Sequence, residues 1–193
     1  MILVTGFAPF DGAELNPSYE AVKGLNNISE LGKYIETLEL PVVFGKAAEI
    51  LINRISVLKP SAVICVGLAE GRKEITPELI AVNFRNARIP DNEGNQPKYE
   101  RIILQGQDGI FTRLPIREML QRMQDAGIPA NLSTSAGTYV CNEVMYRLLH
   151  DYNGIAGFIH VPSSLELGGD MTIREITRAL SICIQTVLEL TGN

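Results

Sequence analysis

The chain has 193 residues, of which 46% are hydrophobic and 20% charged, and its formal net charge is −5. This length suits one well-cored domain over residues 1–193, and the acidic balance argues against nucleic acid as a partner. No apolar run reaches membrane-spanning length, and the start of the chain is typical of a strand and not of a secretion signal. Two histidines and three widely spaced cysteines predict neither a metal site nor a disulfide framework, so we expect no cofactor and a cytoplasmic location.

Strands and helices are predicted to alternate along the whole chain. In chain order we expect a strand over 2–5, a helix over 17–25, a strand over 35–43, a helix over 46–58, strands over 62–66 and 79–83, a loop over 87–96, a helix over 115–125, a strand over 130–134, a helix over 142–152, a strand over 155–161 and a helix from the Thr172–Glu175 capping box to about Leu190. The continuous apolar run at 62–66 is typical of a strand buried on both faces. This order predicts an α/β protein, a single-domain α/β/α sandwich with a twisted, mostly parallel open sheet.

Cys141 is the candidate nucleophile, because it lies where the strand over 130–134 turns into the helix over 142–152. Free backbone N–H groups and the positive end of a helix dipole meet at such a point, and both favour a thiolate over a thiol. A small buried structural cysteine is the alternative interpretation. We assign that interpretation to Cys65, in a buried strand, and to Cys183, in the apolar stripe of the last helix.

His160 is the candidate partner of Cys141. It lies in an otherwise apolar strand, where an imidazole needs a polar contact, and near a strand end, where open α/β sheets collect ligands. His150 falls in the last turn of a helix, and the helix dipole is enough to explain it. A Cys–His pair needs an acid to orient the imidazole, and the residues alone leave six candidates: Glu70, Glu74, Glu78, Asp91, Glu166 and Asp170.

Five segments carry motifs that occur together in one known family. They are residues 5–10, 75–83, 87–97, 133–142 and 157–162, which read TGFAPF, ITPELIAVN, ARIPDNEGNQP, STSAGTYVCN and GFIHVP. Each resembles a motif of the type I pyroglutamyl peptidases (pyrrolidone-carboxylate peptidases). The resemblance covers nearly the whole chain, with the motifs in the expected order.

The resemblance implies a cysteine peptidase that removes an N-terminal pyroglutamyl (5-oxoproline) residue from peptides. By motif, Cys141 is then the nucleophile, His160 the general base and acid, and Glu78 the orienting acid. The substrate-binding residues that the resemblance implies are Phe7, Phe10, Leu68 and Arg88. The two phenylalanines would flank the lactam ring, and Arg88 would assist the oxyanion or position its loop. The family's α/β/α domain usually assembles as a homotetramer, with pyroglutamylated peptides as its substrates.

The chain departs from the family pattern at four places. Asp11 replaces a usual glycine, Glu70 a small residue or proline, and Leu79 a usual lysine or arginine, while the segment 163–169 looks shortened. These departures leave the three implied catalytic residues in place and affect loop geometry, pocket detail and rate. Two other functions stay open: a binding protein that has lost turnover, and a Cys–His hydrolase of another small amide or thioester.

Overall fold

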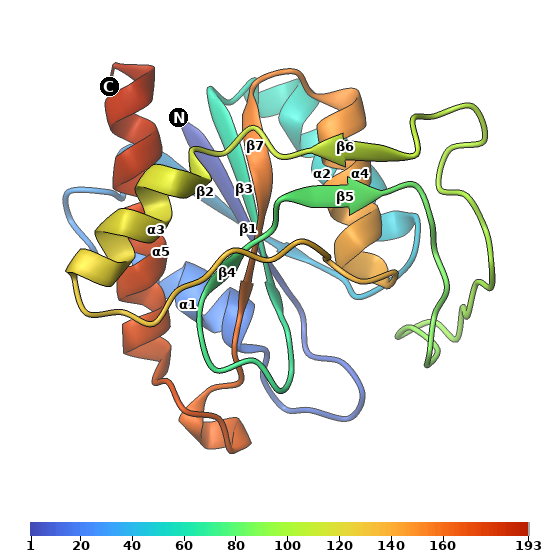
Figure 1. The fold of residues 1–193 in the computed structure, drawn as a ribbon, viewed down its shortest axis with the longest axis horizontal. Coiled ribbons are helices and arrows are strands. Elements are labelled where there is room, and N and C mark those ends of the chain that lie inside the picture. Colours follow the sequence, from blue (N-terminus) through green and yellow to red (C-terminus); the bar gives the residue numbers. More distant parts are fainter. Residues whose placement is uncertain (193) are drawn as a thin grey trace.

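A computed structural model of the chain describes residues 1–192, and a five-stranded sheet lies at its centre (Figure 1). In spatial order the strands are β2 (Ile35–Leu40), β1 (Ile2–Phe7), β3 (Ala62–Leu68), β7 (Ile155–Val161) and β4 (Thr76–Pro77). The first four pair in parallel, and the short β4 pairs antiparallel with β7. The predicted α/β class with a mostly parallel sheet is therefore confirmed.

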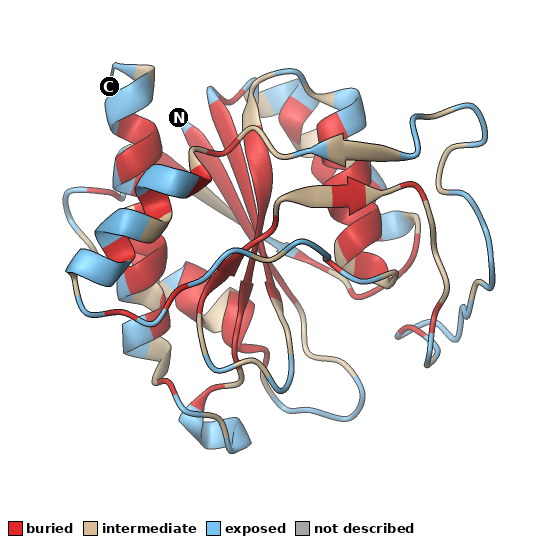
Figure 2. Cartoon of the chain, viewed as in Figure 1, coloured by how far each residue is buried: buried red, intermediate tan, exposed pale blue. Residues whose placement is uncertain are grey.

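Helices cover both faces of this sheet, as Figure 1 shows. One face carries α1 (Pro17–Leu25), α3 (Ile116–Asp125) and α5 (Ile173–Thr191), and the other carries α2 (Lys46–Leu58) and α4 (Val140–Asp151). A two-stranded antiparallel ribbon of β5 (Ile80–Val82) and β6 (Gly109–Phe111) packs beside α4, and the 3₁₀ turn η1 (Leu165–Leu167) follows β7. The buried residues concentrate in the sheet and on the inward sides of the helices (Figure 2).

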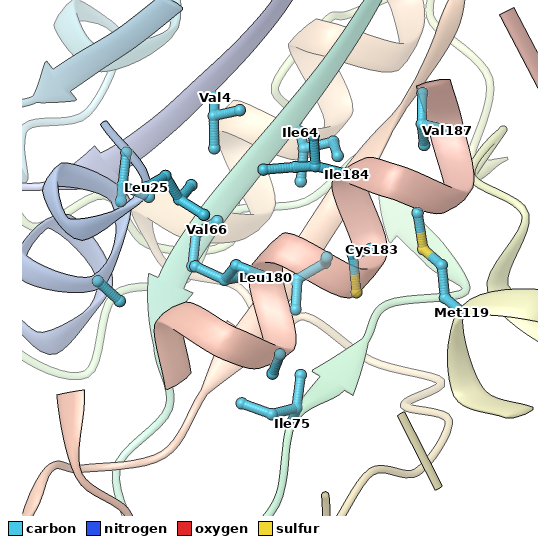
Figure 3. Packing of buried hydrophobic residues seen from close by; sticks show 14 of the residues in the cluster. Val4, Leu25, Ile64, Val66, Ile75, Met119, Leu180, Cys183, Ile184 and Val187 are labelled. Carbon is cyan, nitrogen blue, oxygen red and sulfur yellow. The ribbon is translucent and has the colours of Figure 1, made fainter. Parts of the chain in front are cut away.

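Strand alternation divides the interior into two hydrophobic cores. The first core, under α1, α3 and α5, contains Ile64 and Val66 of β3 (Figure 3), and the second core, under α2 and α4, contains Val63 and Cys65. Successive side chains of a strand point to opposite faces, which explains this division. Along β7 the second core holds Phe158, so the next residue on that face of the strand is His160.

Proline explains where two predicted strands were wrong. The strand predicted over 35–43 ends at Leu40, because Pro41 has no N–H for the ladder. The segment 130–134 forms only isolated bridges to the chain around β4, although Ser133 N donates to Pro77 O at 3.0 Å and Leu79 N to Ser133 O at 2.7 Å. Pro77 has no N–H to donate in the ladder between the Ile75–Ala130 and Glu78–Ser133 bridges, so the pairing breaks there. The strand predicted over 79–83 pairs with β6, which the sequence did not predict, and lies outside the main sheet.

Candidate active site

Cys141 is the second residue of α4, which begins at Val140, two residues earlier than predicted. The chain enters this helix through a turn of small residues, where Gly137 has a φ of +77°, a conformation that favours glycine. The thiol lies against the backbone of β3: a Cβ atom placed on Gly67 would be 2.9 Å from Cys141 Sγ. Glycine at position 67 therefore gives the sulfur its space.

A buried imidazole–carboxylate pair lies on the neighbouring strand. His160 Nδ1 is 2.7 Å from Glu78 Oε1, and the residues are only 4% and 0% exposed. Glu78 directly follows β4, in which Thr76 is the register partner of His160, so the antiparallel pairing brings the two side chains together. Of the six acids that the residues left open, Glu78 is the one bonded to His160.

The thiol and the imidazole share one face of the sheet. Gly67 and His160 are register partners in the β3–β7 pairing, and side chains at paired positions point to the same face. The sulfur of Cys141 occupies the space where a side chain of Gly67 would lie, over that same face. The structure therefore collects Cys141, His160 and Glu78 around the carboxyl ends of β3 and β7.

The electrostatics of the pair favour a neutral imidazole beside an ionised carboxylate. Burial lowers the pKa of His160, and the charge of Arg72 lowers it further, against the opposing effect of Glu78. Burial acts to raise the pKa of Glu78, but the hydrogen bond and charge of His160, with help from Ser133 and Arg72, lower it overall. His160 can then donate its Nδ1 proton to Glu78 and leave Nε2 as a base.

The thiol of Cys141 departs from the expectation for a helix start. Burial raises its pKa to about 12, and the negative charge of Glu78 adds to that rise. The charge of Arg72 and the backbone N–H of Cys141 act in the opposite direction without overcoming the burial. The helix start thus acts in favour of the thiolate, as predicted, but desolvation exceeds this effect, so the neutral thiol is favoured in the free protein.

A small, largely apolar cavity of about 40 Å³ opens at Cys141. Its walls include Phe7, Phe10, Val42, Leu68, Tyr139 and Cys141. Phe7 is buried and Phe10 is half-buried. Three of the four residues assigned to substrate binding, Phe7, Phe10 and Leu68, therefore meet at the thiol.

Arg88, the fourth residue assigned to substrate binding, lies in an adjoining cavity of about 230 Å³. Phe10, Leu68 and Tyr139 line this outer cavity as well, so the two cavities share a wall. Arg88 is exposed there, as is Glu70. The structure thus places Arg88 beside the entrance and not on the inner cavity at Cys141.

Side-chain bonds from neighbouring elements hold the cavity loops. Asn16 caps α1 by accepting from Ser18 N at 3.1 Å, and its amide donates to Ala8 O at 3.0 Å, which fixes the loop that carries Phe10. On the other side, Asn92 Nδ2 donates to Pro9 O at 2.9 Å, and this links the same loop to the segment 87–97.

The buried carboxylate of Asp91 organises the segment 87–97 itself. It accepts from the backbone N–H groups of Phe44 at 2.8 Å, Glu93 at 2.9 Å and Asn95 at 2.8 Å. Burial opposes ionisation of Asp91, but these bonds and the Asn95 amide lower its pKa overall. Asp91, one of the six acids considered as the orienting residue, therefore has a loop-holding role.

The four departures have plain structural consequences. Asp11 adopts a φ of +52°, the left-handed conformation that glycine enters without strain and that aspartate tolerates. Leu79 packs against the first core and away from the face of His160, while Glu70 is exposed in the outer cavity. The segment 163–169 closes as the tight turn η1, with Gly169 N donating to Ser164 O at 2.8 Å.

Three residues of the site were missed at the level of sequence. Gly67 was interpreted only as the end of its strand, and Tyr139 only as part of a motif. Arg72 lies in the loop between β3 and β4, and its Nη1 is 2.7 Å from Glu78 Oε1. Arg72 is six residues from Glu78 in the sequence, and this spacing predicts their contact only when the path of the loop is known.

The described residues 1–192 lack two further features. They contain no group of three or more His, Cys, Asp or Glu residues that could hold a metal ion. Within the same residues, every helix is too short or too polar to cross a membrane.

A thiol, a buried imidazole–carboxylate pair and an apolar cavity at the ends of parallel strands define the class of protein as a cysteine-type hydrolase. A family model described as pyroglutamyl peptidase matches residues 1–190. Pyrrolidone-carboxylate peptidase 1 of Photorhabdus laumondii is 43% identical over 100% of this chain and 94% of its own length. A pyrrolidone-carboxylate peptidase of Yersinia pestis is 44% identical over 98% of this chain and 93% of its own.

Solved structures agree with the relatives. Pyroglutamyl peptidase I from Bacillus amyloliquefaciens superposes with a TM-score of 0.91 at 42% identity, over 96% of this chain and 93% of that one. A mutant pyrrolidone carboxyl peptidase from Pyrococcus furiosus gives 0.90 at 40% identity, over 97% and 98%. The chain therefore belongs to the pyroglutamyl peptidase family, as its motifs predicted.

Proposed function

We propose that the protein hydrolyses the amide bond after an N-terminal pyroglutamyl residue of peptides, through a thioester on Cys141. The observation that carries this proposal is the buried His160–Glu78 bond on the sheet face where the thiol of Cys141 lies against Gly67. A nucleophile, a base and an orienter of the base are the three parts that acyl transfer requires. Membership of the family supports the same reaction.

In the first step, Cys141 Sγ attacks the carbonyl carbon of the pyroglutamyl residue. Because the pKa of the thiol is raised to about 12 and that of His160 is lowered, both begin neutral, and Nε2 of His160 takes the thiol proton as the S–C bond forms. The C–N bond then breaks, and the imidazolium gives this proton to the leaving amine. Glu78 stabilises the imidazolium meanwhile through Nδ1.

In the second step, water hydrolyses the thioester. His160 Nε2 removes a proton from the water as its oxygen attacks the carbonyl carbon, and the S–C bond breaks. The departing sulfur recovers the proton, which restores the neutral thiol and releases free pyroglutamate. In both steps the first-turn N–H groups of α4, with that of Cys141 foremost, can bind the developing oxyanion.

The cavity at Cys141 favours a neutral lactam over a charged ring. Phe7, Phe10 and Leu68 offer apolar contact, whereas a prolyl ring would carry its ammonium charge into this surface. A space of about 40 Å³ is too small for the ring as it stands. The half-buried walls, which include Phe10, therefore have to open on binding, while the buried Phe7 supplies a fixed wall.

Residues beyond the pyroglutamyl group would lie in the outer cavity, where Arg88 can contact the peptide backbone. Arg88 is thus a substrate-binding residue in this proposal. Assembly as a homotetramer stays a prediction from the family resemblance, and a cytoplasmic location stays a prediction from the cysteine content.

Hydrolysis of three fluorogenic amides by the pure protein tests the proposal. We expect turnover of the pyroglutamyl amide and poor use of the prolyl and glutaminyl amides. Phe10→Ala should weaken use of the pyroglutamyl amide by about 1–3 kcal/mol in transition-state free energy, the usual range for one apolar pocket contact. Equal cleavage of the prolyl amide by wild type would reject the pocket argument, and no cleavage of any of the three would reject the proposed activity.

A further inference from the structure

Glu78 has a second charged partner besides His160. Arg72 Nη1 lies 2.7 Å from Glu78 Oε1, the oxygen that also bonds His160 Nδ1. Within residues 1–192, Arg72 is the one Lys or Arg that forms an ion pair with Glu78. We propose that Arg72 is a positioning residue, which neutralises Glu78 and aims it at His160 so that the imidazole stays free to accept the thiol proton. This inference rests on the proposed function.

The guanidinium of Arg72 connects three segments that build the site. Nη1 bonds Thr76 Oγ1 at the start of β4 as well as Glu78, and Nη2 donates to Ser135 O at 3.2 Å. Ser135 belongs to the turn that leads into α4 and Cys141. One planar fork thus fixes the acid, the strand beside His160 and the entry to the nucleophile helix, a task that suits arginine's rigid set of donors.

The charge balance explains why this contact matters for the reaction. Glu78 is fully buried, and a buried carboxylate needs a cationic partner or takes up a proton. If His160 were its only partner, the pair would take up a proton more readily, either as an imidazolium beside the carboxylate or as a carboxylic acid beside the imidazole, and an imidazolium could not accept the proton of Cys141. Arg72 supplies the permanent positive charge instead, so His160 can remain neutral.

Residue 79 cannot supply a cation at Glu78 in this protein. The family usually has a cation directly after the catalytic glutamate, and this chain has leucine there, packed against the first core on the opposite face. Arg72 approaches Glu78 from the loop between β3 and β4. The cation at Glu78 in this protein is therefore Arg72 and not residue 79.

The contact between Arg72 and Glu78 can be tested by substitution, because the arginine side chain is partly exposed to solvent. The side chain of Arg72 is 28% exposed, and it lines an open cavity of about 610 Å³ between residues 71–76 and 132–135. Lys73, the next residue, is 81% exposed and pairs with Asp170 at 3.4 Å. Lys73→Ala thus removes the same charge one position away from the contact.

We expect Arg72→Ala to lower kcat about 10- to 100-fold on the pyroglutamyl amide while KM changes less than about threefold. Arg72→Lys keeps the charge without the fork and should lower kcat about three- to tenfold. Lys73→Ala should match wild type. Because the small side chain opens room beside Glu78, added guanidinium chloride at non-denaturing concentration should partly restore Arg72→Ala, whereas the neutral analogue urea should not.

A spectroscopic readout separates positioning from general structural support. The chain has two histidines, so His160 can be followed by NMR with His150 as internal reference. Removing a cation makes proton uptake easier, so the His160–Glu78 pair in Arg72→Ala should take up its proton at higher pH than in wild type. The acid limb of the kcat/KM profile should shift upward in parallel, and Lys73→Ala should show neither shift.

Three results would overturn the inference: an active Arg72→Ala with wild-type kcat, equal losses in Lys73→Ala, or an unchanged titration of His160. If Arg72→Ala does not fold, Arg72→Lys still decides, because wild-type kcat in that variant would exclude any need for the fork. An inactive wild type would reject the proposed function, and the titration of His160 would still test the contact with Glu78.

Discussion

The two faces of the central sheet differ in what they bury. On the face under α1, α3 and α5, the residues of β3 and β7 are apolar, for example Ile64, Val66 and Ile159, and they pack into a continuous first core (Figure 3). On the face under α2 and α4, the same strands carry Gly67 and His160 at their carboxyl ends. On this face of β7, the side chain changes from the apolar Phe158 to the polar His160 two positions later.

Several buried polar groups of the second face are bonded to partners on neighbouring elements. His160 is bonded to Glu78, and the amide of Asn142 bonds the backbone of β5, receiving from Val82 N at 3.0 Å and donating to Val82 O at 2.9 Å. Glu143 accepts from Gly45 N at 3.2 Å and forms an ion pair with Arg85. We infer that the first face supplies stability and that the second gives up apolar burial to build a site.

The strongest test of this comparison is to replace one cysteine on each face by alanine. Cys141 lines the cavity on the second face, and Cys183 is fully buried in the first core. We expect Cys141→Ala to lower kcat/KM on a pyroglutamyl amide by at least about 10⁴-fold, because no other group can form the thioester. Cys183→Ala should keep activity within about twofold and cost roughly 1–2 kcal/mol of unfolding free energy, since it leaves a small cavity.

Alkylation gives an independent check on the same pair. Brief treatment of native protein with iodoacetamide, followed by peptide mapping, should label Cys141 before Cys65 and Cys183, with activity lost in step. Loss of activity on labelling of Cys65 or Cys183, while Cys141 is still unlabelled, would contradict the assignment.

Adjacent residues that face opposite cores give the next largest contrast. Glu78 reaches His160, whereas Leu79 packs against the first core. Glu78→Gln should lower kcat/KM by at least roughly 10²-fold, because the amide cannot hold the imidazole and stabilise the imidazolium as a carboxylate does. Leu79→Arg should stay within about tenfold of wild type. Kinetics on one pyroglutamyl amide, with folding checked by circular dichroism, measures both, and a nearly silent Glu78→Gln would remove Glu78 from the mechanism.

Alanine substitution of one glycine on each face should give a smaller contrast: activity should fall at one position and only stability at the other. A Cβ at position 67 would come 2.7 Å from Phe158 Cζ and 2.9 Å from Cys141 Sγ, so Gly67→Ala should displace the thiol and lower kcat/KM by about tenfold, with roughly 1–3 kcal/mol of destabilisation. At Gly24 the new Cβ would meet Thr177 Oγ1 at 2.8 Å, under the first face. Gly24→Ala should therefore shift the melting temperature alone. An equal loss of activity in both variants would contradict the division between the faces.

Most of the sheet could be predicted because buried parallel strands are continuous apolar runs, as at 62–66, and the caps at Asn16 and Thr172 mark helix starts locally. The segment 130–134 could not, because its pairing is interrupted by Pro77 on a distant part of the chain. The motifs pointed to Glu78 and His160, whose contact lies 82 positions apart in the sequence.

The protonation state of Cys141 was outside the reach of sequence reasoning. The helix start is a local feature and was located to within two residues, but burial depends on everything packed around the sulfur. The same limit applies to Arg72, whose contact with Glu78 requires the loop to turn at Gly71, where φ is +80°. The pKa values in a site depend on all the residues packed around it, and a sequence motif names only some of these residues.

The smallest expected effect is a difference in how stability depends on pH. Burial lowers the pKa of His160 in the folded protein, and unfolding returns it to an ordinary value of about 6.5. As pH falls below that value the unfolded state binds more protons than the folded state, so stability falls, by up to about 1.4 kcal/mol per pH unit for each extra proton. Glu78, whose pKa is also lowered overall, adds to the loss only at the lower pH where free carboxyl groups titrate.

His160→Asn should therefore unfold with a shallower pH dependence between pH 7 and 5 than wild type, although it is less stable at pH 7. Urea unfolding followed by circular dichroism at several pH values measures these slopes. Identical slopes in His160→Asn and wild type would mean that the buried imidazole is not the group whose protonation destabilises the fold. The second face would then not carry the acid sensitivity that its buried polar groups predict.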